Sequence, residues 1–346
     1  MDYATASSFV YAKAKGMIAK SFVGTRINKI FTVQSLGELW SLLFKSEVPL
    51  VPEVMLAKKI EQEIELRFIS DFKKLLDAFD EPNDFCKVLL QKYDYGNLKE
   101  FSSALLVGMT QKPFYYDIGK YALLRYKKWP SIAGLTEETV LSWYKEAPSR
   151  KQQAYYDSLL DQHYIFELWD ALKTVPKKQR TILQDYLSEE FILQNIIWAL
   201  RLKIYYSMTN DEILTHLAFS TKEKNKDDIL VQPALKILEY PLDSYEVWSS
   251  WKYKDLVNTS VDTASWRIDP RWVEHSAQVM LYKKAYALFH RYSECSLCLF
   301  CLYKIKQYET NCVRTCAEGL RLHVYGQDSL SFVENTQQAP LFTDNA

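Results

Sequence analysis

The chain has 346 residues, a length at which one hydrophobic core stops growing, so two or three packing units are expected. Hydrophobic residues at 48% and charged residues at 25% are usual for a folded soluble protein and exclude general disorder. Lysine plus arginine and aspartate plus glutamate both total 43, and this balance argues against a nucleic-acid binder, which normally carries a basic excess.

Helical periodicity dominates the sequence. The clearest element lies between residues 53 and 79, where apolar residues recur at steps of three, four and one, with charged residues between them. Its apolar positions are Ile60, Ile64, Phe68, Phe72, Leu75, Leu76 and Phe79. Strand-like alternation is absent over any useful length, and 9 glycines provide few tight β-turns. We therefore predict an all-α protein that is roughly two-thirds helix or more.

Three short motifs predict where helices begin. Ser35 with Glu38, and Thr209 with Glu212, have the spacing of capping boxes, in which side chains bond the unpaired amides of a first helical turn. Thr136, which precedes two glutamates, predicts a third start. Proline and glycine clusters separate the helical stretches.

Neither a signal peptide nor a membrane span is evident. The first eight residues lack the basic region and apolar run of a signal peptide, and no stretch reaches about 18 apolar residues. We expect a cytoplasmic protein.

A weak internal repeat recurs around three asparagines. Asn97, Asn195 and Asn311 each follow an acidic or aromatic approach and precede an apolar and basic stretch. The main interpretation of each asparagine is a helix N-cap or an equivalent structural hydrogen bond, and the alternative is a partner-facing surface.

The spacing of these strings suits three units of roughly a hundred residues. We predict helical repeats at residues 1–108, 109–214 and 215–324, followed by a loose polar tail at residues 325–346.

Five of the six cysteines lie between Cys295 and Cys316. A Cys-x-x-Cys-x-x-Cys run resembles the start of an iron–sulfur ligand string, but the Cys-Pro that usually follows is missing. The residues between the cysteines are apolar, so packing on one face of a buried helix is the favoured interpretation, and disulfides are not expected.

No other constellation predicts chemistry. The five histidines are scattered, and no phosphate-binding glycine loop or nucleophile elbow occurs. We expect no catalytic residue, cofactor or metal. Residues 120–129 mix cations with aromatics, which we interpret as a helix face covered by lysine and arginine stems, with lipid headgroups or a partner's polar loops as the alternative.

Several strings, taken in order, resemble the C-type subunits of V/A-type ATPases (ATP synthases), the bacterial and archaeal relatives of the eukaryotic V-ATPase d subunit. The opening at Tyr11 is similar to the family's Tyr-Ala-x-(basic)-x-x-Met. Tyr93-Asp94-x-x-Asn97-Leu-Lys99 resembles its Tyr-Asp-x-x-Asn-(Leu/Ile)-Lys string. Asn195 to Arg201 is similar to its second repeat, and the stretch ending at Asn311 and Arg314 to its last helix. Two departures are Ile192, where the family tends to have aspartate, and the displaced acid at Glu309.

The resemblance implies a funnel of three similar helical bundles around a pseudo-threefold axis. It implies a non-catalytic central-stalk component of a rotary motor. Its partners would be the D and F subunits of the shaft and the proteolipid rotor ring, during ATP-driven or ATP-making proton or sodium transport. It would be peripheral on the inner face of the membrane, associated indirectly through the ring and without nucleic acid.

Two alternatives remain at this point. A generic all-helical adaptor would share the helix content and the lack of chemistry. A cysteine-rich metal or iron–sulfur enzyme rests only on the cysteines from Cys295 to Cys316.

Overall fold

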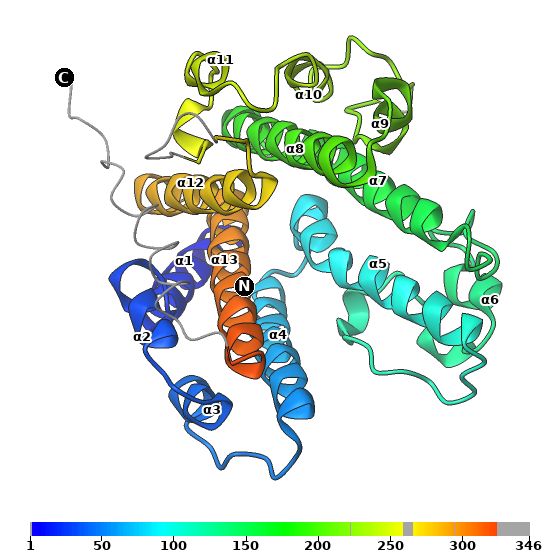
Figure 1. The fold of residues 1–346 in the computed structure, drawn as a ribbon. Helices are drawn as coiled ribbons and strands as arrows, with labels where there is room; N and C mark the ends of the chain where they lie inside the picture. The colour runs from blue at the N-terminus through cyan, green and yellow to red at the C-terminus, as the bar shows by residue number, and fades with distance from the viewer. Residues whose placement is uncertain (1, 222, 259–265, 294, 324–346) are drawn as a thin grey trace. The chain divides into compact units, whose positions relative to one another are not determined.

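The computed structural model describes residues 2–221, 223–258, 266–293 and 295–323 (Figure 1). Every regular element in these ranges is a helix, and helices make up 69% of the structure. The predictions of an all-α fold and of at least two-thirds helix are confirmed. The predicted tail at residues 325–346 lies outside the described residues.

Thirteen α-helices and five short 3₁₀ helices (η) follow one another in the described part of the chain. The α-helices are α1 (Tyr3–Lys20), α2 (Asn28–Phe31), α3 (Leu36–Phe44), α4 (Glu53–Leu76), α5 (Asp84–Leu106), α6 (Ile132–Thr136), α7 (Gln153–Ala171), α8 (Lys177–Tyr206), α9 (Asn210–His216), α10 (Gln232–Ile237), α11 (Tyr245–Ser249), α12 (Pro270–Arg291) and α13 (Cys295–Arg321). The 3₁₀ helices are η1 (Gly24–Ile27), η2 (Gly119–Tyr121), η3 (Tyr126–Lys128), η4 (Leu172–Thr174) and η5 (Lys254–Leu256).

Two of the three predicted helix starts are confirmed. Ser35 caps α3 by accepting the Glu38 amide, and Thr209 forms a complete capping box with Glu212 at the start of α9. The prediction at Thr136 is wrong, because α6 ends at that residue. Its buried hydroxyl group instead donates to the carbonyl oxygens of Ile132 and Tyr144.

The chain divides into two compact units. One unit combines residues 1–80 with residues 278–346, and the other spans residues 81–277. These boundaries differ from the expected ones at 108/109 and 214/215, so the division into three consecutive repeats stays a prediction, as does the funnel around a pseudo-threefold axis.

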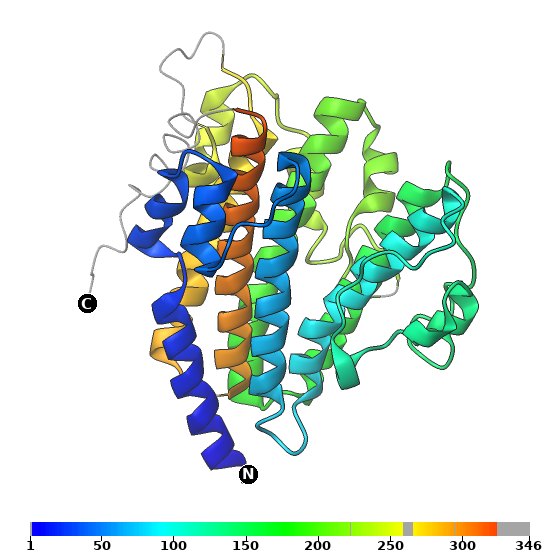
Figure 2. The ribbon, with the colours of Figure 1, turned by 90° about the horizontal axis from the view of Figure 1, so that it is seen from below.

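In the first unit, α13 is the central helix. It packs against α4 and α1 along their lengths, and it also contacts α2 and α3 through fewer residues (Figures 1 and 2). The predicted stripe of α4 faces this core, since Ile60, Phe68, Phe72 and Leu76 are each at most 3% exposed. Helices α1 and α4, from the N-terminal part of the sequence, thus share one hydrophobic core with α13.

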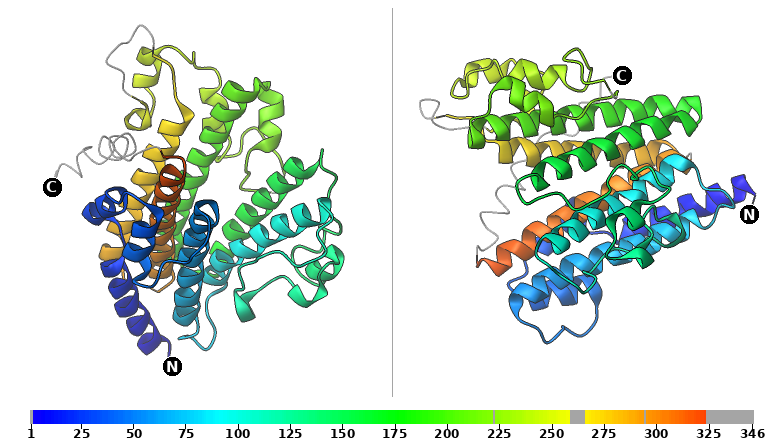
Figure 3. Two further views of the ribbon diagram at one scale, coloured as in Figure 1. Left: turned by 60° about the horizontal axis from the view of Figure 1, so that its bottom comes forward. Right: turned by 90° about the vertical axis from the view of Figure 1, so that its right-hand side faces the viewer.

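The second unit contains two helical groups. In one, α5 packs against α7, and in the other α8 packs against α9 and α10 (Figure 3). Long connections follow α5 and α9, and they carry the backbone groups that Asn97 and Asn195 bond.

Candidate functional site

The string around Asn97 lies inside α5, which begins at Asp84, rather than at a helix start. Asp94 and Asn97 are buried, at 0% and 2% exposure. The Asn97 side-chain oxygen accepts a hydrogen bond from the Tyr116 amide at 2.9 Å. Its nitrogen donates to the Tyr116 carbonyl oxygen at 2.8 Å and to the Tyr126 hydroxyl oxygen at 2.6 Å. One side chain therefore fixes two points of the segment that follows α5.

Asp94 completes this buried polar cluster. Its carboxylate accepts hydrogen bonds from the Tyr126 hydroxyl and from the Leu123 amide. Burial disfavours the charged form and raises the pKa of Asp94 to about 6, although these hydrogen bonds act in the opposite direction. Burial and the neighbouring carboxylate also raise the pKa of Tyr126, so the phenol stays protonated and donates at neutral pH.

Asn195 makes the same kind of contact within α8. It is 0% exposed, and its side-chain oxygen accepts the Ala218 amide at 2.8 Å. Its nitrogen donates to the carbonyl oxygens of Ala218 and Leu230, both at 2.8 Å. The long helix is thereby bonded to two points of the connection between α9 and α10.

The N-cap interpretation of these asparagines is wrong, because all three lie within helices. An N-cap residue bonds amides of its own first turn, whereas Asn97 and Asn195 bond backbone groups of another segment. The other part of that interpretation, an equivalent structural hydrogen bond, describes the contacts of both residues, and a partner-facing role stays a prediction. Each buried amide satisfies backbone groups that would otherwise lack partners.

In the third string, around Asn311, the asparagine does not occupy the position that Asn97 and Asn195 occupy in the other two. Asn311 is half-buried, and Arg314 donates to its side-chain oxygen at 3.3 Å. Glu309 is 3% exposed and accepts the amide of Phe22 in the segment after α1, as Asp94 accepts the Leu123 amide. Glu309 is therefore the counterpart of Asp94, and Cys312 rather than Asn311 occupies the position that matches Asn97.

The basic residues of the strings join neighbouring helices. Lys99 connects α5 to α7, Arg201 connects α8 to α12, and Arg314 connects α13 to α4. Their ion pairs are Lys99–Asp161 at 2.6 Å, Arg201–Glu274 at 2.5 Å, and Arg314–Glu61 and Arg314–Glu65 at 3.4 and 3.6 Å. All are partly exposed to solvent, where such a pair contributes about 0–1 kcal/mol.

The two tyrosines of the strings make ring contacts. Tyr11 of α1 stacks on Phe289 of α12, with ring centroids 5.5 Å apart. Tyr93 of α5 contacts the ring of Tyr116, with centroids 5.4 Å apart. Tyr93, Asp94 and Asn97 thus lie around one loop, whereas Asn195 and Arg201 belong to separate contacts of the same unit.

Sequence reasoning missed Tyr126, which bonds both Asp94 and Asn97. It lies within residues 120–129, where the expected helix face is wrong. The chain forms the short helices η2 and η3 there, with irregular backbone between them. In the sequence, Tyr126 is an aromatic residue among cations. This pattern does not reveal that it bonds buried side chains about thirty residues earlier in the chain.

The cysteines of α13 are packed in the core. All six cysteines of the chain are buried and form no disulfide. Burial raises the pKa of Cys295, Cys312 and Cys316 to about 12, and that of Cys298 and Cys301 further. A thiol that stays protonated is a poor metal ligand and nucleophile. Among the described residues, no three or more histidine, cysteine, aspartate or glutamate side chains are grouped to hold a metal ion.

Within the described ranges, no helix has both the length and the apolar character needed to cross a membrane.

Long helices bonded by buried side chains to later connecting segments define an all-α protein. The sequence model of the ATP synthase (C/AC39) subunit matches residues 10–325, nearly the whole chain, and the protein belongs to this family. It is also 28% identical over 316 residues to an uncharacterized protein of Treponema pallidum (strain Nichols), covering 90% of this chain and 92% of that protein. The family resemblance seen in the sequence is confirmed.

Proposed function

We propose that the protein is a non-catalytic central-stalk subunit of a V-type ATPase, a socket that couples the rotating shaft to the membrane rotor ring. The observation that carries the proposal is the family match over residues 10–325. The motor would use this joint during ATP-driven, or ATP-making, transport of protons or sodium ions.

The helices suit a part that transmits torque. α4, α8 and α13 have 24, 30 and 27 residues, and at 1.5 Å per residue α8 is about 45 Å long. Asn195 and the Asp94–Asn97 pair bond the loops to the long helices at several points. Loops held in this way yield less when a partner pulls on them, because opening them breaks buried hydrogen bonds.

The proposed partners are the D and F subunits of the shaft and the proteolipid ring, with membrane association occurring through the ring. Of the string residues, those that are half-exposed are the candidates for partner contact, and Lys99, Arg201 and Arg314 are the charged members of that group. The fully buried Asp94, Asn97 and Asn195 would act by holding the scaffold.

The first test is purification of the tagged full chain, expressed at its native level, in mild detergent. Shaft proteins and the proteolipid ring should co-purify with it in fixed ratio. Purification of neither, with an unrelated partner in their place, would refute the proposal and favour a general adaptor.

The second test separates coupling from catalysis. In extracts of cells lacking the chain, the detached catalytic part should still hydrolyse ATP, while the membrane vesicles should build no ion gradient. Adding back the wild-type chain should restore pumping. Unchanged ion pumping in its absence would contradict a coupling role.

A further inference from the structure

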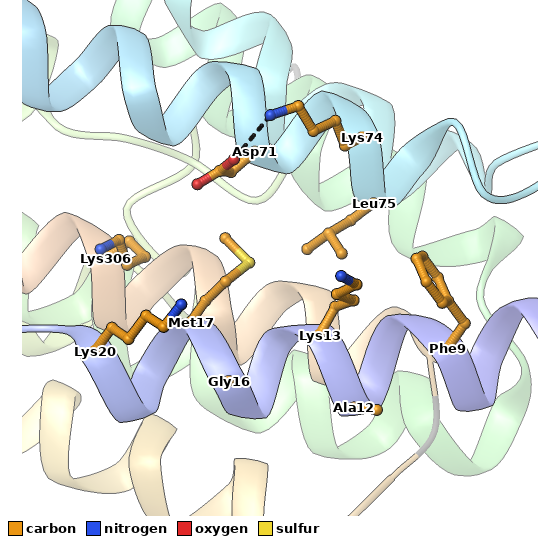
Figure 4. A pocket seen from close by; sticks show the side chains of 10 residues that line it. All are labelled: Phe9, Ala12, Lys13, Gly16, Met17, Lys20, Asp71, Lys74, Leu75 and Lys306. Carbon is orange, nitrogen blue, oxygen red and sulfur yellow. Dashed lines mark hydrogen bonds and ion pairs between the residues drawn. The ribbon is translucent and has the colours of Figure 1, made fainter.

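A pocket of about 620 Å³ opens on the first unit between α1, α4 and α13 (Figure 4). This volume is within the range of about 300–1,000 Å³ usual for small-molecule sites. Its wall on α1 contains Phe9, Lys13, Gly16, Met17 and Lys20. The opposite wall is formed by Asp71, Lys74 and Leu75 of α4, with Lys306 contributed by α13.

The charges that line this pocket do not balance. Asp71 is the only carboxylate of its lining, and it pairs with Lys74 at 3.2 Å. Lys306 pairs with Glu309 and donates to the Ser21 hydroxyl oxygen at 3.0 Å. Lys13 and Lys20 have no ion-pair partner among the described residues, so two positive charges are left in excess.

Lys20 is not required to cap its own helix. A cation near the last turn often bonds the free carbonyl groups of a helix. At the end of α1 this role belongs to Arg26, which donates to the carbonyl oxygens of Ile18 and Ala19. The Lys20 ammonium group is therefore available to the pocket.

The two ends of the pocket differ in chemistry. Figure 4 shows Lys20 and Lys306 at one end, beyond Met17, and Phe9 with Lys13 and Leu75 at the other. The Phe9 ring is 40% exposed, and the Lys13 ammonium lies 5.6 Å from its centroid. One end therefore offers two ammonium groups to an anion, and the other an aromatic face beside an apolar side chain and the Lys13 ammonium.

Between the two ends the wall is kept open by Gly16. A Cβ atom at this position would meet no heavy atom within 4 Å. Glycine inside a helix costs about 1 kcal/mol relative to alanine. Gly16 therefore makes α1 less stable than alanine would, at a position where a side chain would project into open space beside the pocket.

We propose that this pocket binds a nucleoside phosphate. Its phosphate groups lie against Lys20 and Lys306, because ammonium groups bind phosphate as point charges, and the charge of Lys13 in the same pocket adds to the attraction. A ribose hydroxyl can donate to Asp71, and the base stacks on Phe9 beside Leu75. No phosphate-binding loop marks such a site in the sequence, and the inference does not depend on the coupling function.

Calorimetric titration of the purified full chain with ADP, inorganic phosphate and adenosine tests the proposal. ADP should bind more tightly than either fragment, since it alone occupies both ends. K13A/K20A should weaken ADP binding about tenfold or more, as expected for lost hydrogen bonds to charged groups. The matched control K58A/K59A removes the same charge from exposed positions of α4 outside the pocket and should leave the affinity unchanged.

A second pair of variants tests shape without changing charge. G16L should abolish ADP binding, while G16A should retain it, and both should keep the fold because each replacement favours a helix over glycine. Equal binding of ADP and inorganic phosphate would overturn the proposal. So would equal losses in K13A/K20A and K58A/K59A, or unchanged ADP binding in G16L.

A phospholipid headgroup also contains a phosphate group, so binding to lipid vesicles must be measured as well. Sedimentation with phosphatidylglycerol vesicles, against phosphatidylcholine vesicles, should show no binding that depends on Lys13 and Lys20. Vesicle binding that K13A/K20A removes, in a chain that does not bind ADP, would overturn the nucleotide assignment in favour of a lipid headgroup.

Discussion

The side-chain amides of Asn97 and Asn195 each make three hydrogen bonds to groups outside their own helix. Each is buried, so water cannot replace a lost partner. Removal of such an amide leaves backbone groups unsatisfied, and this costs about 1–3 kcal/mol per buried group. At this scale the buried amides of Asn97 and Asn195 stabilise the fold.

Asn195→Leu should therefore destabilise the second unit strongly, by about 2–4 kcal/mol, because Ala218 and Leu230 lose their partners. Asn311→Leu is the matched control, since that side chain is half-buried and makes one weak hydrogen bond to Arg314. Its effect should stay below about 1 kcal/mol. Thermal unfolding followed by circular dichroism measures both, and equal effects would contradict the assigned roles.

Asp94 should make stability depend on pH. Its folded-state pKa of about 6 is raised above the ordinary value of 3.8, so folding favours the protonated carboxyl group. The stability that comes from burying the protonated carboxyl group is fully present below about pH 3.8 and is lost as the pH rises through about 6. The free energy of unfolding of the wild type should therefore fall relative to that of Asp94→Asn between pH 4 and pH 7, by about 3 kcal/mol.

Thermal midpoints of wild type and Asp94→Asn at several pH values check this prediction. The variant removes the titration of residue 94, and it also replaces one acceptor oxygen by a donor, at a cost that does not depend on pH. The pH dependence of the difference between the two midpoints therefore isolates the carboxyl group. A difference that stays constant from pH 4 to pH 7 would show that the carboxyl group does not titrate in this range.

At the scale of elements, local patterns identified helices well. The stripe from Ile60 to Leu76 predicted α4, and capping motifs predicted the starts of α3 and α9. Periodicity is a property of one segment and can be read from it. The partners of Asn97 and Asn195 are 19 to 35 residues further along the chain, so no local pattern distinguishes these residues from N-caps.

The register of the third string could not be read from its asparagine for the same reason. The acid at Glu309 was visible in the sequence, but its significance depends on the Phe22 amide, 287 residues away in the chain. Thr136 failed as a helix start because its hydroxyl group bonds carbonyls within the fold rather than amides of a following turn.

α13 should present cysteines that do not react in the folded state. Burial raises the pKa of each thiol in the helix to about 12 or above, so almost no thiolate exists near pH 8. A thiol reagent should label these cysteines slowly in the native protein and quickly in guanidinium chloride. Rapid native labelling, or stoichiometric iron or zinc in the purified protein, would revive the metal-site alternative.

At the scale of the whole molecule, the first unit is assembled from both ends of the sequence. α4 and α1 of its N-terminal part pack on α13, which lies more than two hundred residues later in the chain. The second unit, at residues 81–277, includes both partners of every contact described for Asn97 and Asn195. Fragments of the chain can test whether these two units or the three predicted repeats fold independently.

A fragment of residues 81–277 should fold alone, with helical content and slow amide exchange in α5 and α8, because α5 packs on α7 and α8 packs on α9 and α10 within those residues. A fragment of residues 1–108, the first predicted repeat, should not fold, since α1 and α4 would expose the apolar faces that α13 covers. Adding a peptide of residues 278–323 to residues 1–80 should restore helical structure, whereas a peptide from α8 of similar length should not. A cooperative unfolding transition in fragment 1–108 alone would show instead that consecutive repeats are the folding units.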